Sequence, residues 1–598
     1  MVMNKCLLTL CLVFCCTVCA LAEWKDASAA GEILKYPPTL HCLGVHWVVK
    51  GDKNENASVD VRFRKAGEDT WREGMPLFRG RPDRGPSGQT PLHNVENGWL
   101  FAGSVVDLIP DTEYEVKLLL KDPDGGNAEK VLKMKTWKEP MPPQGMRERH
   151  VVPLGGSEPG GAGTAGDPIR GLQTAVNRAK PGDLFLLHNG VYVNGTLNIR
   201  TSGDLGNPII FRGAGDGEAV LNGGKGRKRG GRLVSGVSTS HIWFEDVTFR
   251  NRSYLIVAHK SSHWVLRRCR FLAFDKAFVA HNGGFYASQH HFISDNYFKG
   301  YGVWPRKGIR GGYGTFLTGS GHVICYNRFE HVGDGVHGSQ YGFLSASDIH
   351  NNDAFICEDD GYEADETMAN TRYFDNRVIN TYHGYTTQPI HGGPAYIYRN
   401  LAYNCAHAPL KIYSVNSGSS GIVIYQNTFV CRGWGMHQDP RDCTKNLTTR
   451  NNLFIGSKAG YVTQSGWYEH SDMQNDGFGG APGRSGKPHI KVNSKKSSIY
   501  NTHPAILIDN TTCFEMKDPV PKKWQIVYRA EDIDLRLGRD SGALDKGVRL
   551  PNFNDGYTGK APDLGCYERG KPLPHYGPRP RGFSLTKEIL KHAPESRR

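Results

Sequence analysis

The stretch Ile324-Cys325-Tyr326-Asn327-Arg328-Phe329 decides the fold: it holds a short apolar run, an asparagine, and an aromatic residue two positions later. The same pattern, ending in an aromatic or aliphatic residue, occurs at Asn296, Asn327, Asn352, Asn376, Asn400, Asn427 and Asn452. From Asn327 onward, these asparagines follow one another at intervals of 25, 24, 24, 27 and 25 residues. The interval from Asn296 to Asn327 is 31 residues, so this repeat contains an insertion.

A period near 25 residues fits one turn of a coil made of three short strands that meet at glycine and asparagine corners. Leucine-rich repeats have a similar length, but their Leu-x-x-Leu-x-Leu signature is missing, and helical repeats need about 33 residues or more. Asparagine at a fixed corner can stack its amide on that of the next coil, and it tolerates a left-handed backbone. We therefore expect an all-β fold with a parallel β-helix over residues 150–570.

The composition excludes disordered and collagen-like chains. Hydrophobic residues make up 38% of the 598 residues and charged residues 22%, which provides enough apolar mass for a large core. Glycine (73) and proline (33) are frequent, as a chain with many turns requires. The formal net charge of +14 favours anionic partners such as acidic polysaccharides. No nucleic acid is expected as a partner, because no recognised nucleic-acid-binding motif accompanies this charge.

Residues 1–22 have the features of a secretory signal peptide: a positively charged start, an apolar run and an Ala-x-Ala cleavage site. We expect a secreted or periplasmic protein that begins at Glu23, is monomeric and has no transmembrane anchor. Nine cysteines remain, an odd number without a C-x-x-C pair, so neither a disulfide framework nor a zinc site is expected. Cysteines in strand-like runs, such as Cys325, are expected to be small buried hydrophobic residues.

Both ends of the coil have recognisable sequence patterns. Residues 169–180 have the pattern of a short amphipathic helix that caps the open end of the coil, and residues 181–192 follow as its first turn. This opening resembles the pectate-lyase-like right-handed parallel β-helix superfamily, and residues 535–568 resemble the closing segment of its secreted bacterial members. The resemblance implies the fold but no single reaction, because the superfamily includes lyases, hydrolases, epimerases and non-enzymatic adhesins.

The N-terminal part is expected to be a separate module. Residues 59–64 alternate between apolar and charged side chains, as a half-buried strand does. The run Leu108-Ile109-Pro110-Asp111-Thr112-Glu113-Tyr114 resembles the fibronectin type III pattern, in which the tyrosine hydroxyl bonds back to the backbone. The resemblance implies a β-sandwich over residues 23–137 that serves as a spacer or binding module. A linker at 138–149 precedes the β-helix, and a tail at 571–598 follows it.

The coil permits a prediction about side chains, because residues at the same place in consecutive turns stack about 4.8 Å apart. Aligning the strand that follows each asparagine by 10 or 11 residues gives two outward-facing columns. The first column contains His337, Glu363, Thr386, Lys411 and His437. The second contains Ser339, Asp365, Gln388, Tyr413 and Asp439, with His259 and His281 added from earlier turns. This density of titratable and aromatic residues indicates a functional groove rather than an ordinary solvated face.

Carboxylates are concentrated in this region. Six of them lie within nine residues: Glu358, Asp359, Asp360, Glu363, Asp365 and Glu366. So many carboxylates repel one another unless a cation or a proton lies among them. One solution is Ca²⁺, a hard oxygen-binding ion, for which Asp359, Asp360, Glu363 and Asp365 are the candidate ligands. The other is a general acid that stays protonated.

Lys411 lies two turns from Glu363, roughly 10 Å away by the spacing of the turns. Lyases of the superfamily remove the proton next to a uronic-acid carboxylate with a Lys or Arg base, often with Ca²⁺ neutralising that acid. The resemblance therefore implies that Lys411 is the base, in an electropositive site that lowers its pKa. The Asp and Arg motifs of pectate lyases have no clear match here, so this assignment rests on role. The catalytic candidates are Lys411, His337, Glu363 and Asp365.

The insertion between Asn296 and Asn327 is expected to project as a loop beside the groove, where an aromatic residue and three cations suit an anionic sugar chain. The candidate substrate-binding residues are Trp304, Arg306, Lys307 and Arg310 of this loop, with Gln388, Tyr413 and His437. Four further histidines lie at corners, where histidine is more often structural than catalytic: His331, His383, His391 and His407.

These features favour a secreted polysaccharide-degrading enzyme, first of all a lyase that cleaves an acidic, uronic-acid-containing glycan by β-elimination. A glycoside hydrolase that uses a carboxylate pair on the same fold is the alternative enzyme. A non-catalytic glycan-binding or cell-surface protein is the alternative from another class. The sequence does not specify the sugar or the linkage.

Overall fold

The computed structural model describes residues 24–80, 95, 97–192, 195–224, 231–281, 288–338, 343–413, 419–438, 443–456, 461–463, 467–479, 490–492 and 506–583. The predicted signal peptide lies outside these residues, as do Ser339 and Asp439 of the second predicted column. Among the described residues, none of the helices has the length and hydropathy that crossing a membrane requires.

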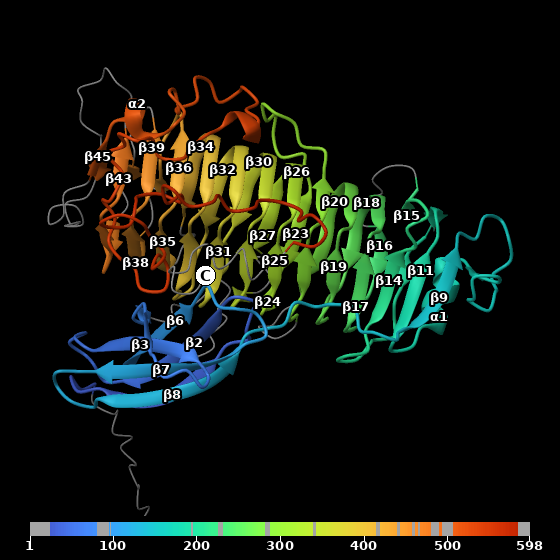
Figure 1. The fold of residues 1–598 in the computed structure, drawn as a ribbon, viewed down its shortest axis with the longest axis horizontal. Coiled ribbons are helices and arrows are strands. Elements are labelled where there is room, and N and C mark those ends of the chain that lie inside the picture. Colours follow the sequence, from blue (N-terminus) through green and yellow to red (C-terminus); the bar gives the residue numbers. More distant parts are fainter. Residues whose placement is uncertain are drawn as a thin grey trace, which may run out of the picture.

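The predicted parallel β-helix is confirmed by two long parallel sheets that run the length of the molecule (Figure 1). The first, of 15 strands, consists of β10 (Ile169–Arg170), β9 (Arg147–Val152), β11 (Asp183–Leu187), β14 (Ile209–Gly213), β17 (Ile242–Glu245), β19 (Val265–Arg267), β21 (Phe292–Ser294), β25 (Val323–Cys325), β29 (Asp348–His350), β31 (Thr371–Phe374), β33 (Ala395–Tyr398), β35 (Ser419–Tyr425), β38 (Cys443–Arg450), β41 (Trp467–Glu469) and β42 (Asp472–Gln474).

The second sheet carries the predicted groove. Its 20 strands are β12 (Gly190–Tyr192), β13 (Leu197–Asn198), β15 (Ala219–Asn222), β16 (Arg232–Ser235), β18 (Thr248–Val257), β20 (Arg270–Ala280), β22 (Tyr297–Lys299), β23 (Tyr313–Leu317), β26 (Arg328–Val332), β27 (Asp334–Gly338), β30 (Asp353–Glu363), β32 (Arg377–Thr387), β34 (Leu401–Ile412), β36 (Thr428–Cys431), β37 (His437–Gln438), β39 (Leu453–Gly456), β40 (Tyr461–Thr463), β43 (Gly477–Gly479), β44 (Ile490–Val492) and β45 (Ile506–Ile508). A short pair, β24 (Gly319–Ser320) and β28 (Leu344–Ser345), lies at a corner of the coil.

Helices are short in the described part of the chain. The predicted cap is present as α1 (Leu172–Arg178), which buries Leu172, Ala175 and Val176 against the first turns. Past the last turns lie α2 (Asn510–Cys513) and a 3-10 turn at Ala530–Asp532.

The repeated asparagines form a buried ladder between turns. The Oδ1 of Asn327 accepts hydrogen bonds from the backbone N–H (3.0 Å) and the side-chain amide (2.9 Å) of Asn296, and its own amide donates to the carbonyl of Ile293 (2.8 Å). The same arrangement continues through Asn452, whose backbone and amide donate to Asp476 at 2.9 and 2.8 Å. The ladder therefore satisfies buried backbone groups at one corner of successive turns.

One detail of the corner differs from expectation. The left-handed backbone belongs to the residue before each ladder asparagine, as in Tyr326 (φ 57°) and Arg399 (φ 53°). The residue before the asparagine turns the chain at the corner, and the asparagine side chain makes the ladder hydrogen bonds.

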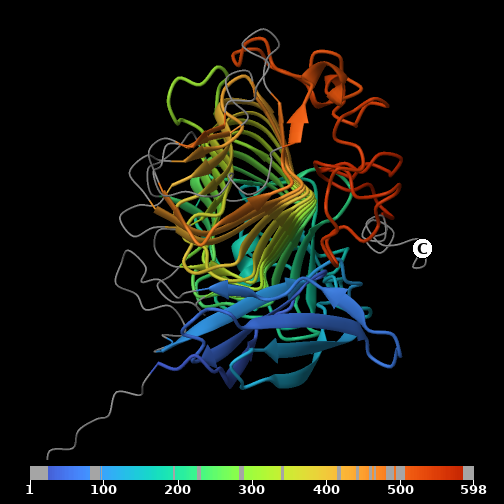
Figure 2. The same ribbon diagram turned by 90° about the vertical axis from the view of Figure 1, so that its left-hand side faces the viewer.

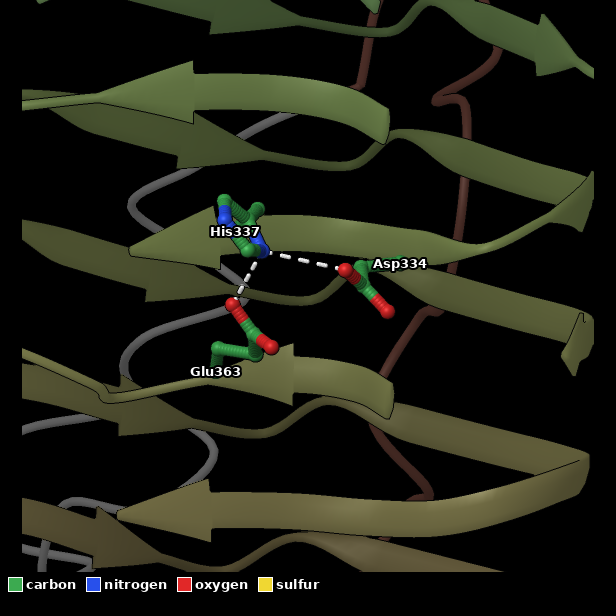
Figure 3. Close-up of side chains that lie close together, drawn as sticks. All are labelled: Asp334, His337 and Glu363. Carbon is green, nitrogen blue, oxygen red and sulfur yellow. Dashed lines mark hydrogen bonds and ion pairs between the residues drawn. The ribbon is translucent and has the colours of Figure 1, made fainter. Parts of the chain in front are cut away.

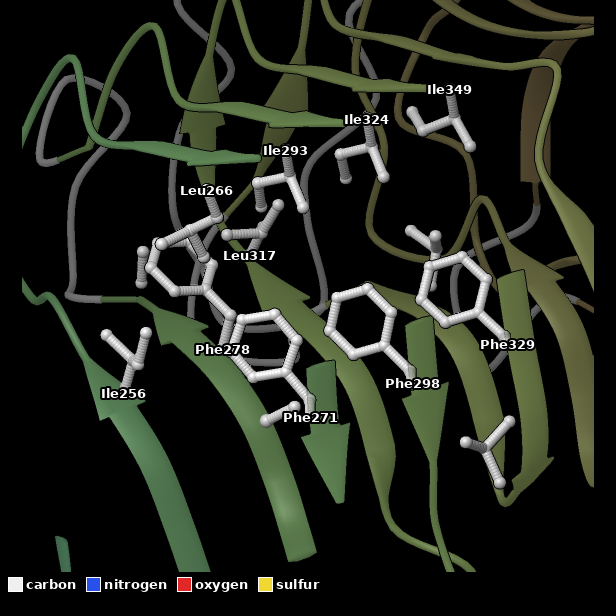
Figure 4. Close-up of a cluster of buried hydrophobic side chains, with 14 of the residues drawn as sticks. Ile256, Leu266, Phe271, Phe278, Ile293, Phe298, Leu317, Ile324, Phe329 and Ile349 are labelled. Atoms are coloured by element: carbon white, nitrogen blue, oxygen red, sulfur yellow. The ribbon is translucent and has the colours of Figure 1, made fainter. Parts of the chain in front are cut away.

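The interior is filled by apolar side chains that stack in register (Figure 4). Phe249, Phe271, Phe298 and Phe329 follow one another with ring centroids 5.1, 4.6 and 4.7 Å apart. The eight cysteines whose side chains are described are all buried and unpaired, which agrees with their expected role as small core residues.

The N-terminal module consists of two four-stranded antiparallel sheets around a shared core. One sheet contains β1 (Ala29–Lys35), β2 (Leu43–Lys50), β6 (Gly98–Val105) and β5 (Phe78–Gly80); the other contains β4 (Arg72–Gly74), β3 (Ser58–Lys65), β7 (Glu113–Lys121) and β8 (Ala128–Lys135). The expected tyrosine bond is present, since the N–H of Ile109 donates to the hydroxyl of Tyr114 at 3.0 Å. The assignment to the fibronectin type III family stays a prediction.

The module lies against the flank of the β-helix (Figures 1 and 2). Arg399, on the β-helix, forms two buried hydrogen bonds of 2.7 Å to Asp107 of the module and also contacts Asp375. Arg372 is fully buried, pairs with Asp348, and donates to Ser104 of the module at 2.9 Å. Separating the module from the β-helix would leave these buried charges without their partners, which is costly. The module is therefore fixed to the β-helix.

The ladder gives a test of what stabilises the coil. Replacing Asn376 by alanine removes the acceptor of two bonds from Asn352 and the donor of bonds to Ile349 and Asn400. We expect a loss on the order of 3 kcal/mol, because each buried group left unpaired costs about 1–3 kcal/mol. Calorimetry should show a lower unfolding midpoint for Asn376→Ala than for Asn177→Ala, which changes an exposed residue of α1. Equal midpoints would show that the ladder does not support the fold.

Candidate functional site

The predicted first column is confirmed in the register of the second sheet. Glu363 pairs with Thr386, Thr386 with Lys411, and Lys411 with His437 on successive strands. The pairing of Val336 with Tyr362 places His337 beside Glu363 in the same column. Apolar neighbours of the column residues point inward and are buried in the core, so the polar side chains face out.

Asp334, His337 and Glu363 form the first cluster of the site (Figure 3). The Nδ1 of His337 lies 3.0 Å from Asp334 Oδ2 and also forms an ion pair with Glu363. The other oxygen of Asp334 accepts the backbone N–H of Asp360 at 2.9 Å, which fixes the carboxylate. Sequence reasoning missed Asp334; its signal is the position at the start of β27, three residues before His337.

A second cluster is centred on Asp360. Its Oδ2 accepts a hydrogen bond from Lys411 Nζ at 3.3 Å, and its Oδ1 lies 2.6 Å from His383 Nδ1. The Nε2 of His383 in turn lies 2.9 Å from His407 Nδ1. Sequence reasoning placed both histidines at structural corners, but irregularities in the pairing of β30, β32 and β34 bring them into the site.

The carboxyl groups of the site have pKa values that are driven apart. Burial raises the pKa of Glu363 well above its ordinary value, and the charges of Asp334, Asp365 and Asp360 add to this effect. Burial raises the pKa of Asp365 to about 7. Asp359 also reaches a pKa of about 7, through burial and the charges of Asp360 and Asp334. Asp360 differs: burial opposes its ionisation, but Lys411 and His383 hold its pKa below the usual range.

Lys411 has acidic rather than electropositive surroundings. Burial by itself would lower its pKa, but the charges of Asp360, Asp365 and Glu363 outweigh this effect and raise it. The amine of Lys411 is therefore an ammonium group at neutral pH. The described residues therefore do not form the electropositive site that was expected to lower the pKa of Lys411.

Two of the six clustered carboxylates are structural. Glu358 accepts hydrogen bonds from the backbone N–H groups of Val303 (2.9 Å), Arg310 (2.5 Å) and Gly311 (2.5 Å), and so anchors the inserted loop. Glu366 pairs with His391 Nε2 at 2.8 Å. Asp360 is buried, so it is not part of a solvated acidic turn.

The predicted substrate-binding residues have different environments. Arg306 reaches the site: its guanidinium lies 3.5 Å from Asp359 and 3.7 Å from the centroid of the Tyr382 ring. Trp304 instead packs against Trp524, to whose carbonyl it donates a hydrogen bond of 3.0 Å. Lys307 and the side chain of Arg310 are exposed.

At the other end of the column, Tyr413 lies near both Lys411 and His437. The Nζ of Lys411 is 5.1 Å from the centroid of the Tyr413 ring, and the ring of His437 is 5.7 Å from it. Gln388 is half-buried just after β32. The described members of the second column, Asp365, Gln388 and Tyr413, lie just past the ends of their strands, and the column stays a prediction.

Two groups of side chains in the described part of the chain can hold a metal ion. They are Asp334, His337 and Glu363, and Asp359, Asp360 and His383, each with ligand atoms within 4.8 Å of one another. Each group includes a histidine nitrogen, whereas Ca²⁺ takes oxygen ligands. Mixed nitrogen and carboxylate sets suit a transition-metal ion better. Asp365, a predicted calcium ligand, belongs to neither group, and calcium stays a prediction.

No protein-family model and no curated protein sequence matches this chain. Among solved structures, it is similar to XylC in complex with xylose (11% identity, TM-score 0.42, covering 70% of this chain and 98% of that one). It is also similar to an alginate lyase from Paenibacillus sp. str. FPU-7 (16%, 0.30, 50% and 95%) and to a polygalacturonase from Erwinia carotovora ssp. carotovora (12%, 0.30, 56% and 95%). These scores are too low to carry an argument about activity, and the fold rests on the strand pairings above.

The raised pKa of Asp359 predicts a pH dependence of stability. The folded protein holds a proton on this residue between about pH 4 and pH 7 that the unfolded chain has lost, so this contribution to stability falls as pH rises. Asp359→Asn removes the effect. We expect the free energy of unfolding of this variant, relative to that of wild type, to rise by on the order of 4 kcal/mol as the pH goes from 4 to 7.

The control is Asp540→Asn, at an exposed residue far along the chain. Calorimetry at pH 4, 5.5 and 7 should give a constant difference between this control and wild type. A constant difference for Asp359→Asn as well would contradict the raised pKa.

Proposed function

We propose that this protein is a secreted enzyme that cleaves an acidic polysaccharide in the groove on the second sheet. The observation that carries the proposal is the set of carboxyl groups on one face whose pKa values are driven in opposite directions. Asp360 is ionised, while Asp359 and Asp365 have pKa values of about 7. General acid and base catalysis is most efficient when the pKa lies near the working pH.

Hydrolysis would use these groups if the glycosidic bond lies between the carboxyl groups of Asp359 and Asp365. One of Asp359 and Asp365 donates its proton to the leaving oxygen of the glycosidic bond, and the other, ionised, takes a proton from water. The hydroxyl of that water bonds to the anomeric carbon as the glycosidic bond breaks. Burial is the main cause of both raised pKa values, and the charge of Asp360 adds to each.

The cations of the site support an acidic substrate. Lys411 is protonated and lies 5.1 Å from the centroid of the Tyr413 ring, and its ammonium group is suited to pair with a sugar carboxylate. Arg306 forms an ion pair with Asp359 at 3.5 Å. The net charge of +14 adds a general attraction for polyanions, and the signal-like residues 1–22 support export.

β-Elimination is the second candidate, because Lys411 stands in the column where a base would act. This reaction requires the free amine of Lys411, and a divalent cation bound among the carboxylates would lower the pKa of Lys411 by charge repulsion. Asp334, His337 and Glu363 are the ligands that the geometry supports for such an ion. The lyase and its calcium ion remain proposals. They can be tested because elimination requires a bound cation that lowers the pKa of Lys411.

The test is an activity screen on a panel of acidic polysaccharides, with and without chelator. Hydrolysis gives new reducing ends without ultraviolet absorbance, and elimination gives both. For hydrolysis, Asp359→Asn and Asp365→Asn should each lower kcat by about 100-fold or more, because each removes a proton-transfer group. Asp540→Asn should retain wild-type turnover.

Lys411→Ala separates the two reactions. Under hydrolysis it should raise KM more than it lowers kcat, since the lysine binds the substrate. Under elimination it should abolish the absorbance, and chelation should do the same. Failure of the wild-type protein to cleave any acidic polymer on the panel would refute the proposed function and leave the glycan-binding alternative.

A further inference from the structure

The outward face of the second sheet continues past the carboxyl cluster toward the N-terminal turns. Lys276 on β20 pairs in register with Tyr313, and Tyr313 pairs with Asp334 of the cluster. Lys276 therefore lies two turns from Asp334, about 10 Å along the coil. Lys276, Tyr313 and Asp334 thus occupy the same position in successive turns. A polysaccharide bound at the carboxyl cluster and running along the axis of the coil would pass Lys276.

Aromatic rings connect Lys276 to the cluster. Its Nζ lies 3.7 Å from the centroid of the Phe316 ring and 5.2 Å from that of Tyr313. Tyr313 and Phe316 in turn stack on His337, at centroid distances of 4.3 and 4.8 Å with ring planes within 13°. Cation–π contacts thus hold the ammonium group in one place beside the site.

The charge of Lys276 is not balanced within the described part of the chain. Burial alone lowers its pKa, and no described carboxylate forms an ion pair with it. The neighbouring His281 is neutral, because burial and the charges of His259 and Lys276 lower its pKa to about 4. By contrast, Lys411 pairs with Asp360 and Arg306 pairs with Asp359.

A half-buried cation without an anion is costly to the folded protein, and an arriving carboxylate removes this cost. We infer that Lys276 binds a carboxylate of the polysaccharide in a sugar site farther along the coil from the cleavage point, and so selects acidic over neutral chains. This inference rests on the proposed function. Its ligand is the carboxylate of a uronic acid residue, held over the aromatic rings of Tyr313 and Phe316.

The experiment compares Lys276→Met with wild type on one acidic polymer that the protein cleaves and on the same polymer with its carboxylates methyl-esterified. Methionine keeps an apolar stem of similar length but removes the charge. We expect KM on the acidic polymer to rise about tenfold with kcat within twofold, because a charge-assisted contact that is equal in ground and transition states is lost. KM on the esterified polymer should not change.

Two further variants complete the design. Lys276→Arg should restore most of the affinity for the acidic polymer. Lys299→Met, at an exposed lysine at the end of β22, is the matched control and should behave as wild type on both polymers. An unchanged KM for Lys276→Met, or an equal rise on both polymers, would overturn the inference while the proposed function stands.

A binding assay distinguishes failure of the Lys276 inference from failure of the proposed function. If the wild-type protein cleaves nothing, the retention of the full chain on immobilised polygalacturonate is measured against a neutral glucan column. Weaker retention of Lys276→Met than of Lys299→Met supports the carboxylate site even though the enzyme proposal has failed. Equal retention of both variants and wild type overturns the site as well.

Discussion

The hydrogen bond between one asparagine and the next is the interaction on which the rest of the molecule depends. Each ladder amide binds the backbone and the side chain of the asparagine one turn away, inside a core where no water competes. Successive turns are thereby held at a fixed register. Any two side chains that occupy equal positions in neighbouring turns must consequently lie side by side.

This register turns a periodic sequence into a site. His337, Glu363, Thr386 and Lys411 are far apart in the chain but consecutive along one column. The interior demands apolar residues at alternate positions, which leaves the outward positions free to carry charge. At β30 and β32, irregular pairing adds Asp360 and His383 to the same face. The site is therefore built on strands rather than on mobile loops, which favours precise geometry.

Charge within the site is organised by proximity and burial. Carboxyl groups outnumber cations around Asp360, so some of them hold protons near neutral pH while Asp360 itself stays ionised beside Lys411. The same excess of carboxylates keeps Lys411 protonated. A cation, either from a substrate's counter-ion or from a bound metal, would change all of these pKa values together, because the groups share one field.

The sequence by itself determined the coil, its capping helix, the N-terminal sandwich with its Tyr114 bond, and the outward column from His337 to His437. It could do so because these features follow from a fixed repeat and from the alternation of side chains along strands. Only the tertiary structure decided the rest. His383 and His407 join the site through irregular pairing that no periodic pattern encodes, Asp334 joins it from the start of β27, and Glu358 leaves it to anchor a loop. The direction of the Lys411 pKa shift also depends on carboxylates that only folding brings within reach, since electrostatic effects act through space.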